Sequence, residues 1–354
     1  MAVRECILMK ISSLPELMVS QGGTHIFDPA EWRSRRVELL ELLQKYEYGH
    51  IPAAPESVSA RRLCTFELPE SKEVVGEHLY LTTHPLGLSF NIRLYLPMGQ
   101  SGPFPVIIDG DDCWRYLSNE FILTAIRRGY ALVFYNRTEI VPDHPGPRDF
   151  GLYNAIPAGE YGALAAWAWS YHRVVDYLLS RPEIDPQRIG VTGHSRGGKT
   201  ALLAGAIDER IAFTHANCSG MCGAATLRDP DEGGEKLARI TEEFDYWFTP
   251  RLQEFVGRED ELPIDQHMLK ACIAPRALLT TEARDDIWAS PRATRRTFAA
   301  AREAYHLLGA EKNIGIYYRD GSHTITLDDW TTMLDFADKT LYGKDSGRDF
   351  DMQG

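Results

Sequence analysis

Six short apolar runs follow residue 104 and constrain the fold more than any other feature of this sequence. Helical patterns separate most of them, for example around residues 162–179 and 292–308. Strands that alternate with helices are typical of βαβ units, in which a mostly parallel sheet is covered on both faces. The runs lie at residues 106–108, 131–135, 189–192, 212–216, 277–280 and 314–318.

The N-terminal third of the chain predicts one helix followed by strands. Asp28 can cap a helix that begins at Pro29, and Glu31 stands at the position that completes a capping box. We expect this helix to end near residues 48–49. Residues 57–97 contain apolar and polar residues in alternation, which predicts strands.

We expect one catalytic domain, formed by residues 28–342. Residues 1–27 show no strong pattern, so this N-terminal segment is expected to be partly mobile, and residues 343–354 are expected to form a C-terminal tail. Residues 217–270 are rich in charge and glycine and too long for a simple connection. We therefore predict that they hold short helices that cover the active edge of the sheet.

Composition excludes several classes of partner. The net charge of −12 disfavours nucleic acids and anionic membrane surfaces. No apolar run reaches the ~20 residues that a membrane-spanning helix needs. The first ten residues do not resemble a signal peptide, which leads us to expect a cytoplasmic protein. The six cysteines form no C-x-x-C pair and are expected to be reduced, with a disulfide as the alternative.

Residues 193–200 read Gly-His-Ser-Arg-Gly-Gly-Lys-Thr and match two motifs. One is G-x-S-x-G, the nucleophile elbow of α/β-hydrolases, which exposes Ser195 on a tight turn between a strand and a helix. The other is G-x-x-x-x-G-K-[ST], the phosphate loop of nucleotide-binding proteins. Both motifs lie between a strand and a helix, so the local context does not separate them.

The order of residues further along the chain favours the hydrolase. An α/β-hydrolase needs an acid and then a histidine after its serine. Asp285 and Asp286 follow the fifth apolar run, and His323 follows the sixth. Open α/β sheets place their active sites in such loops. We predict an α/β-hydrolase fold, a three-layer sandwich, with Asp285 preferred to Asp286 as the acid; a nucleotide-binding module is the distant alternative.

The expected chemistry is acyl transfer to a serine. Ser195 needs a base to remove its proton, His323 fills that role, and the acid orients the imidazole. The backbone N–H of Arg196 should point into the oxyanion hole at the positive end of the following helix. Gly193 and Gly197 should relieve crowding in the turn.

Two other histidines have structural interpretations. His194 lies inside the elbow but is expected to point away from the face of Ser195, and His267 is expected to form structural hydrogen bonds. Nothing in the sequence requires a metal ion or an organic cofactor, so neither is expected.

Residues 193–199 resemble the G-[CH]-S-R-x-G-K signature of the glucuronoyl esterases, carbohydrate esterase family 15. The resemblance covers roughly residues 30–342. Four further phrases resemble the bacterial branch of this family; they lie at residues 244–248, 262–269, 273–276 and 286–291.

The resemblance implies a substrate class and several substrate contacts. The substrates would be esters of 4-O-methyl-glucuronic acid with lignin alcohols, taken as small molecules or oligosaccharides. By matched position, the Arg196 side chain would assist the oxyanion, Lys199 would contact sugar hydroxyls, Trp288 would line the sugar pocket and Glu235 would be an acidic sugar contact. The alternatives are a solvated Lys199 and a Trp288 packed in the core.

One position departs from the fungal pattern. Fungal members carry their triad glutamate in a Gln-Glu-Ser-Gly phrase, whereas residues 217–220 here read Asn-Cys-Ser-Gly. Cys218 cannot serve as the acid, so the acid must come from Asp285 or Asp286. Because of this change, other small-ester hydrolases, such as an acetyl esterase or a lactonase, and an inactive sugar-binding relative stay as alternatives.

Overall fold

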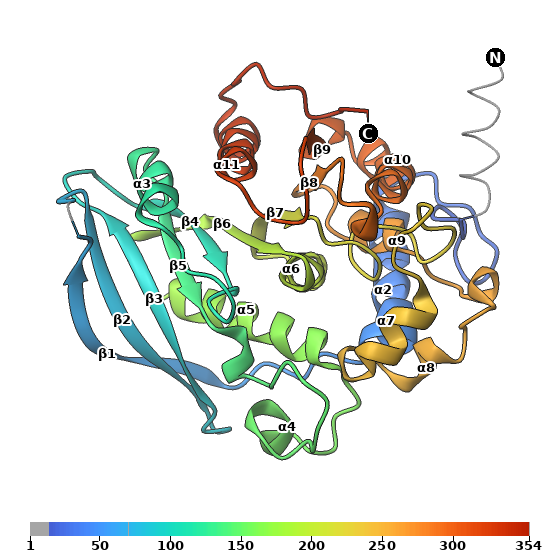
Figure 1. Ribbon diagram of the computed structural model, residues 1–354, viewed down its shortest axis with the longest axis horizontal. Helices are drawn as coiled ribbons and strands as arrows, with labels where there is room; N and C mark the ends of the chain where they lie inside the picture. Colours follow the sequence, from blue (N-terminus) through green and yellow to red (C-terminus); the bar gives the residue numbers. More distant parts are fainter. Residues whose placement is uncertain (1–13, 70, 354) are drawn as a thin grey trace.

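A nine-stranded mixed sheet crosses the molecule in the computed structural model, which describes residues 14–69 and 71–353 (Figure 1). The strands are β1 (Ser57–Glu67), β2 (Val74–His84), β3 (Ser89–Pro97), β4 (Phe104–Asp109), β5 (Ala131–Tyr135), β6 (Ile184–His194), β7 (Ile211–Asn217), β8 (Ala277–Ala283) and β9 (Ile314–Arg319). Their order is β1-β2-β3-β5-β4-β6-β7-β8-β9. Neighbours from β5 to β9 are parallel, and β1, β2 and β3 extend the sheet in antiparallel fashion. All six predicted runs lie within strands of the parallel part.

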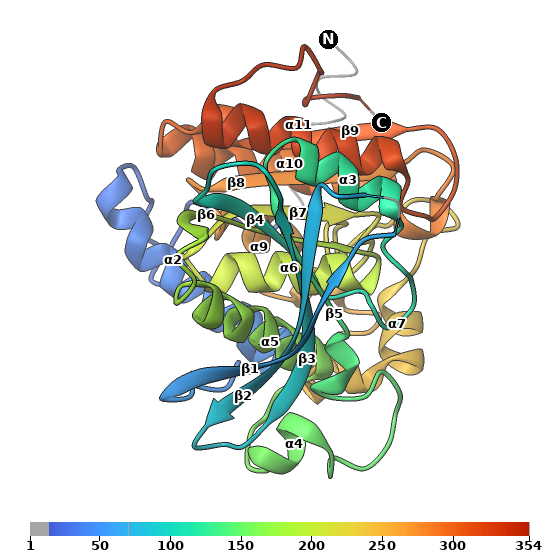
Figure 2. The same ribbon diagram turned by 90° about the vertical axis from the view of Figure 1, so that its left-hand side faces the viewer.

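Helices cover both faces of this sheet (Figures 1 and 2). The helices are α2 (Pro29–Leu43), α3 (Asn119–Arg127), α4 (Gly151–Ala155), α5 (Ala163–Leu178), α6 (Arg196–Ile207), α7 (Leu237–Glu243), α8 (Pro250–Gln253), α9 (Gln266–Ala271), α10 (Pro291–Leu307) and α11 (Leu327–Tyr342). Single 3₁₀ turns occur at Arg137–Glu139, Asp245–Trp247, Glu259–Glu261, Ile287–Ala289 and Glu311–Asn313. Helices α3 and α11 pack on one face, and α5, α6, α9 and α10 pack on the other. The predicted three-layer α/β fold is confirmed.

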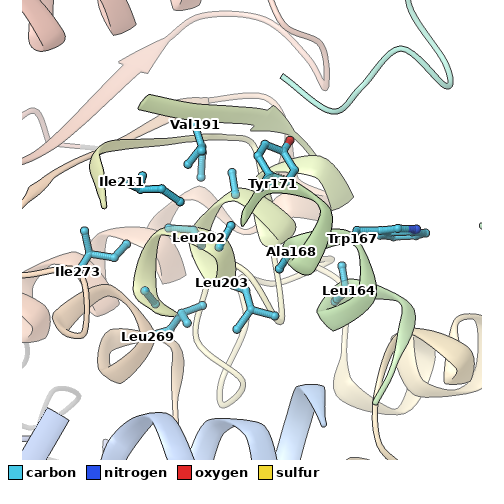
Figure 3. Close-up of a cluster of buried hydrophobic side chains, with 14 of the residues drawn as sticks. Leu164, Trp167, Ala168, Tyr171, Val191, Leu202, Leu203, Ile211, Leu269 and Ile273 are labelled. Carbon is cyan, nitrogen blue, oxygen red and sulfur yellow. The ribbon is translucent and has the colours of Figure 1, made fainter. Parts of the chain in front are cut away.

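The alternation of strand side chains explains why both faces are covered. Val106 and Ile108 of β4 enter the core under α5 and α6, whereas Ile107 between them enters the core under α3 and α11. Helix α6 lies at the centre of the larger core, where Leu202 packs near Val191 of β6 and Ile211 of β7 (Figure 3). This packing fixes the start of α6 against the end of β6.

Helix α2 begins as its sequence predicts. The Asp28 carboxylate accepts hydrogen bonds from the backbone N–H groups of Ala30 (2.8 Å) and Glu31 (3.0 Å). The Glu31 carboxylate accepts from the N–H of Asp28 in return (3.3 Å), which completes the capping box. The chain continues past Leu43 through a π-helical turn, Gln44–Tyr48, and leaves it at Gly49 with a φ of 80°.

The residues at both ends of the described chain pack on the domain. Residues 1–13 of the predicted mobile segment lie outside the described residues. Beyond them, the carbonyl of Leu17 accepts a hydrogen bond from Arg35 of α2 (3.0 Å), and His267 of α9 contacts the carbonyl of Pro15 (2.9 Å). In the predicted tail, Phe350 is buried under α11.

The segment of residues 217–270 contains α7, α8 and the start of α9, joined by loops and single 3₁₀ turns. Helix α8 packs against α7 and against the π-helical turn Gln44–Tyr48 that follows α2. Among the helices of residues 14–69 and 71–353, none combines the length and the apolar character needed to cross a bilayer.

Candidate active site

Ser195 lies on a strained turn between β6 and α6. Its backbone has φ 56° and ψ −122°, a region that residues other than glycine rarely occupy. A Cβ atom on Gly193 would lie 2.3 Å from the carbonyl oxygen of Gly197, and one on Gly197 would lie 2.1 Å from Oδ1 of Asp111. The turn therefore requires glycine at both positions, as the elbow motif predicts.

Asp111 supports this turn from below, and the sequence did not single it out. Its Oδ2 accepts a hydrogen bond from the backbone N–H of His194 (2.8 Å), and its Oδ1 pairs with the buried Arg137. Burial raises the pKa of Asp111, but the nearby Arg137 and Arg115 guanidinium groups outweigh it and hold the pKa below its usual value. Asp111 therefore stays charged beneath the elbow.

His323 follows β9 and contacts one of the two candidate acids. Its Nδ1 lies 2.5 Å from Oδ2 of Asp286, which is buried after β8. Asp285 is exposed, and its carboxylate instead accepts a hydrogen bond from the N–H of Gly321 (3.2 Å). The preference for Asp285 is therefore corrected. Asp286 is turned inward because it caps the 3₁₀ turn that follows it, with its side chain accepting from the N–H of Ala289.

Cys218 lies at the end of β7, beside the same imidazole. Its Sγ, a carboxylate oxygen of Asp286 and a ring nitrogen of His323 all lie within 4.8 Å of one another. Burial, followed by the negative charge of nearby carboxylates, raises the pKa of the Cys218 thiol well above its usual value. A neutral thiol provides no negative charge to an imidazolium, which leaves Asp286 as the acid that contacts His323.

His194 lies closer to the reacting groups than the sequence led us to expect. Its ring centroid is 4.5 Å from that of His323 and 5.3 Å from that of Trp114, so the ring does not turn away from the site. Its Nδ1 lies 2.5 Å from Oδ1 of Asn217. Burial, and then the proximity of His323, lowers the pKa of His194 to about 4. A neutral ring therefore packs against His323 near neutral pH.

The side chain of Arg196 reaches across the site. Its Nη1 donates to Oδ2 of Asp143 (2.8 Å), and its guanidinium lies 5.2 Å from the ring centroid of Phe244 and 4.7 Å from that of Trp247. About a third of the side chain is exposed. The guanidinium is therefore held at the surface of the site by a carboxylate and two aromatic rings.

Lys199 is buried, which removes the alternative of a solvated lysine. Its Nζ donates to the carbonyl oxygens of Ser219 (2.6 Å) and Met221 (2.5 Å). Burial lowers the pKa of Lys199, and the carboxylate of Glu235 partly opposes that shift. A phosphate loop needs this ammonium to reach a phosphate, whereas two carbonyls of the protein bind it here, so the nucleotide-binding alternative loses its main contact.

Trp288 and Glu235 lie together beside Lys199. Trp288 is 46% exposed, so it is not a core residue. The N–H of Glu235 donates to the carbonyl of Trp288 (3.1 Å), which joins the segment of residues 217–270 to the loop after β8. Burial raises the pKa of Glu235, and the ammonium of Lys199 opposes that shift.

Two cavities meet at Ser195, Arg196 and His323, which border both of them. One has a volume of about 260 Å³, and the other about 710 Å³. The smaller is also lined by Lys199, Cys218, Ser219, Gly220, Glu235, Glu243, Phe244, Trp247, Trp288 and Ala289. The larger is also lined by Cys113, Trp114, Arg137, Thr138, Pro142, Asp143, His144, Phe150 and His194.

Comparisons with known proteins agree on one family. The family described as "Glucuronyl esterase, fungi" matches residues 81–309. The 4-O-methyl-glucuronoyl methylesterase of Schizophyllum commune is 30% identical over 358 residues, which cover 96% of this chain and 85% of that protein. The family 15 glucuronoyl esterase of Caldicellulosiruptor kristjansonii superposes with a TM-score of 0.84 at 31% identity, over 96% of this chain and 93% of that one.

A third relative was solved with a ligand. A serine-to-alanine variant of the glucuronoyl esterase from Sporotrichum thermophile, in complex with methyl 4-O-methyl-β-D-glucopyranuronate, superposes with a TM-score of 0.76 at 28% identity. The match covers 96% of this chain and 91% of that one.

Proposed function

The chain belongs to the glucuronoyl esterases of carbohydrate esterase family 15, which are serine esterases, and from this premise we propose that Ser195 cleaves esters of 4-O-methyl-glucuronic acid. One observation carries the residue assignment. Ser195, Arg196 and His323 line both cavities, at the place where the two cavities meet. The buried carboxylate of Asp286 contacts Nδ1 of His323, which leaves Nε2 as the ring nitrogen that can act on Ser195.

The proposed reaction has two halves. His323 Nε2 removes the proton of Ser195 as Oγ attacks the ester carbonyl, and the Asp286 carboxylate stabilises the imidazolium through Nδ1–H. The tetrahedral oxyanion is stabilised by the backbone N–H of Arg196, at the positive end of α6, and by its guanidinium. The intermediate collapses, the alcohol leaves with the proton from His323, and water then cleaves the acyl-enzyme by the same route.

The two cavities suggest which part of the ester lies where. We assign the uronic acid to the smaller cavity because Lys199, Glu235 and Trp288 provide charged and aromatic groups suited to sugar hydroxyls and ring faces. The larger cavity would then hold the alcohol. Lys199 and Glu235 are both buried there, and each opposes the shift that burial imposes on the pKa of the other, which supports a built polar site.

We also propose that the chain belongs to the bacterial branch of the family. Two observations support this assignment. Cys218 stands where fungal members have their glutamate, and the structural match is closer to the Caldicellulosiruptor kristjansonii enzyme than to the Sporotrichum thermophile enzyme, with TM-scores of 0.84 and 0.76. A phylogeny of the family that groups this chain with the fungal sequences would contradict the assignment.

The test compares hydrolysis of benzyl glucuronate with that of para-nitrophenyl acetate. We expect wild type to prefer the glucuronate and Ser195→Ala to lower kcat by at least about 10³-fold, because the nucleophile is lost. Ser118→Ala removes an exposed hydroxyl and serves as the matched control. Full activity of Ser195→Ala on the glucuronate would overturn the mechanism. Cleavage of the acetate alone, still dependent on Ser195, would indicate an acetyl esterase or another small-ester hydrolase.

A further inference from the structure

The carboxylate that binds Arg196 comes from a loop far from the elbow in sequence. Asp143 follows β5, and Arg196 is the first residue of α6. Their side chains meet at 2.8 Å, between Nη1 of the arginine and Oδ2 of the aspartate. Asp143 also borders the larger cavity, so the ion pair lies at the edge of the space where the ester bond would be placed.

The second oxygen of Asp143 is bound by the segment of residues 217–270. Oδ1 accepts hydrogen bonds from the hydroxyl of Tyr246 (2.9 Å) and from Nε1 of Trp247 (3.0 Å). Both donors come from the single 3₁₀ turn Asp245–Trp247. With donors on both oxygens, the plane of the carboxylate is fixed, and its orientation depends on where this turn lies.

The same turn also holds the arginine directly. The ring of Trp247 lies 4.7 Å from the Arg196 guanidinium and stacks on Phe244, with centroids 4.0 Å apart and planes 8° from parallel. A guanidinium on a flexible side chain has many rotamers, and a carboxylate at one end with an aromatic face beside it selects few of them. Asp143 occupies Nη1, which leaves the other N–H groups free to face the site.

We propose that Asp143 is a positioning residue for the oxyanion. It holds the Arg196 guanidinium against Trp247, in the orientation that stabilises the negative charge of the tetrahedral intermediate. Because Tyr246 and Trp247 fix the Asp143 carboxylate, the position of the guanidinium also depends on where the turn Asp245–Trp247 lies. This inference rests on the proposed function. An interaction that is present only in the transition state affects kcat more than KM, so removing the Asp143 charge should have that signature.

The test is a double-mutant cycle on benzyl glucuronate. Asp143→Asn keeps the size of the side chain and one carbonyl oxygen for Tyr246 and Trp247, but it removes the charge that binds Arg196. We expect kcat to fall about 10- to 100-fold, with KM changed less than about threefold. In an Arg196→Ala background the same substitution should change kcat less than about twofold, because there is no guanidinium left to position. Asp149→Asn, an exposed carboxylate of the same loop, is the matched control.

The outcomes separate this inference from the proposed function. Equal losses on Asp143→Asn in the wild-type and Arg196→Ala backgrounds would show that Asp143 is structural only and would overturn the inference. Should Asp143→Asn fail to fold in a thermal melt, Tyr246→Phe keeps the aromatic ring, removes the hydroxyl that donates to Oδ1 of Asp143, and enters the same cycle with the same expectation of non-additivity. If Ser195→Ala retains activity, the proposed function fails first, whatever the result of the cycle.

Discussion

At the scale of single residues, the backbone of Ser195 is the most constrained point of the site. A residue held in so sparsely populated a conformation costs of order 1–3 kcal/mol. The contacts that hold it there are the N–H of His194 on the Asp111 carboxylate and the close approach of Gly193 and Gly197. The serine is held at the border of both cavities because the strand and helix on either side are packed in the core and the turn between them has no freedom to relax.

The two adjacent aspartates should differ sharply in their effect on activity. Asp286→Asn should lower kcat by about 10²- to 10⁴-fold, because an amide at that position favours the wrong tautomer of His323. Asp285→Asn, the matched control, should change kcat by less than about twofold, since its carboxylate bonds only to the Gly321 backbone in this loop. Steady-state kinetics of both variants decide the matter, and equal losses would show that the observed contact does not identify the acid.

The sequence could predict Ser195 and His323 but not the full site. A motif of fixed spacing marks the serine, and chain order marks the histidine. The choice between Asp285 and Asp286 depends on which side chain turns inward, and both residues lie in the same loop. Asp143 carries no motif, and its partners Arg196 and Tyr246 are 53 and 103 residues away along the chain.

At the scale of elements, the π-helical turn at the end of α2 places a carboxyl group in the interior. Glu47 is fully buried, and both of its oxygens accept from Nε2 of Gln266 (2.9 and 2.8 Å). The neighbouring Tyr48 donates to the carbonyl of Cys222 (3.0 Å), in the turn whose carbonyls bind Lys199. Burial raises the pKa of Glu47 to about 8. The carboxyl group of Glu47 is therefore protonated at neutral pH, and the π-helical turn that carries it is hydrogen-bonded to the loop that binds Lys199 of the smaller cavity.

The raised pKa of Glu47 should make the free energy of unfolding fall as the pH rises. The folded state keeps the proton of Glu47 up to about pH 8, whereas the unfolded chain releases it near the usual value of 4.5. The contribution of Glu47 to the free energy of unfolding is thus full below pH 4.5 and is lost as the pH rises toward 8. Urea unfolding at pH 6 and pH 8 should show a smaller loss for Glu47→Gln than for wild type, by up to about 1.4 kcal/mol per pH unit.

The comparison with wild type isolates Glu47 from other groups that titrate in the same range. Glu254→Gln changes an exposed carboxylate at the end of α8 and should leave the pH dependence as it is in wild type. Parallel stability curves for wild type and Glu47→Gln would contradict the prediction.

Strands and capped helices were predictable because their signals are local. The β4 and β5 runs are apolar throughout, the β7–β9 runs are mostly apolar, and the Asp28 box marks the start of α2. Strand β6 begins earlier than its apolar run, at Ile184, because that residue pairs with Phe104 across the sheet. Pairing between distant residues has no local signature, and neither does the widening of a helix into a π turn.

At the scale of the whole molecule, the C-terminal residues close one of the two helical layers. The ring of Phe350 packs edge-on against Phe336 of α11, with centroids 4.8 Å apart, and its carbonyl accepts from the N–H of Ile316 in β9 (2.8 Å). A single phenylalanine in a polar tail has no periodicity, so the sequence alone led us to place these residues outside the domain. The contact forms only once β9 and α11 are in place.

Removal of this ring should destabilise the fold without changing the chemistry. Phe350→Ala should lower the free energy of unfolding by about 2–4 kcal/mol, because it leaves a cavity in a packed layer. Activity at a temperature where the variant is folded should match wild type. Phe27→Ala removes a ring that is 79% exposed and should change stability by less than about 0.5 kcal/mol. Similar midpoints for both variants in urea would show that Phe350 adds nothing to the core.

The meeting of two cavities at Ser195 sets an order of events. Under the proposed assignment, the uronoyl group stays on the serine in the smaller cavity while the alcohol departs from the larger one. The second nucleophile must then enter the space that the first product has just left. That space is large enough for more than water, so a free alcohol that fits it competes with hydrolysis, and the same serine becomes a donor of uronoyl groups in a ping-pong exchange.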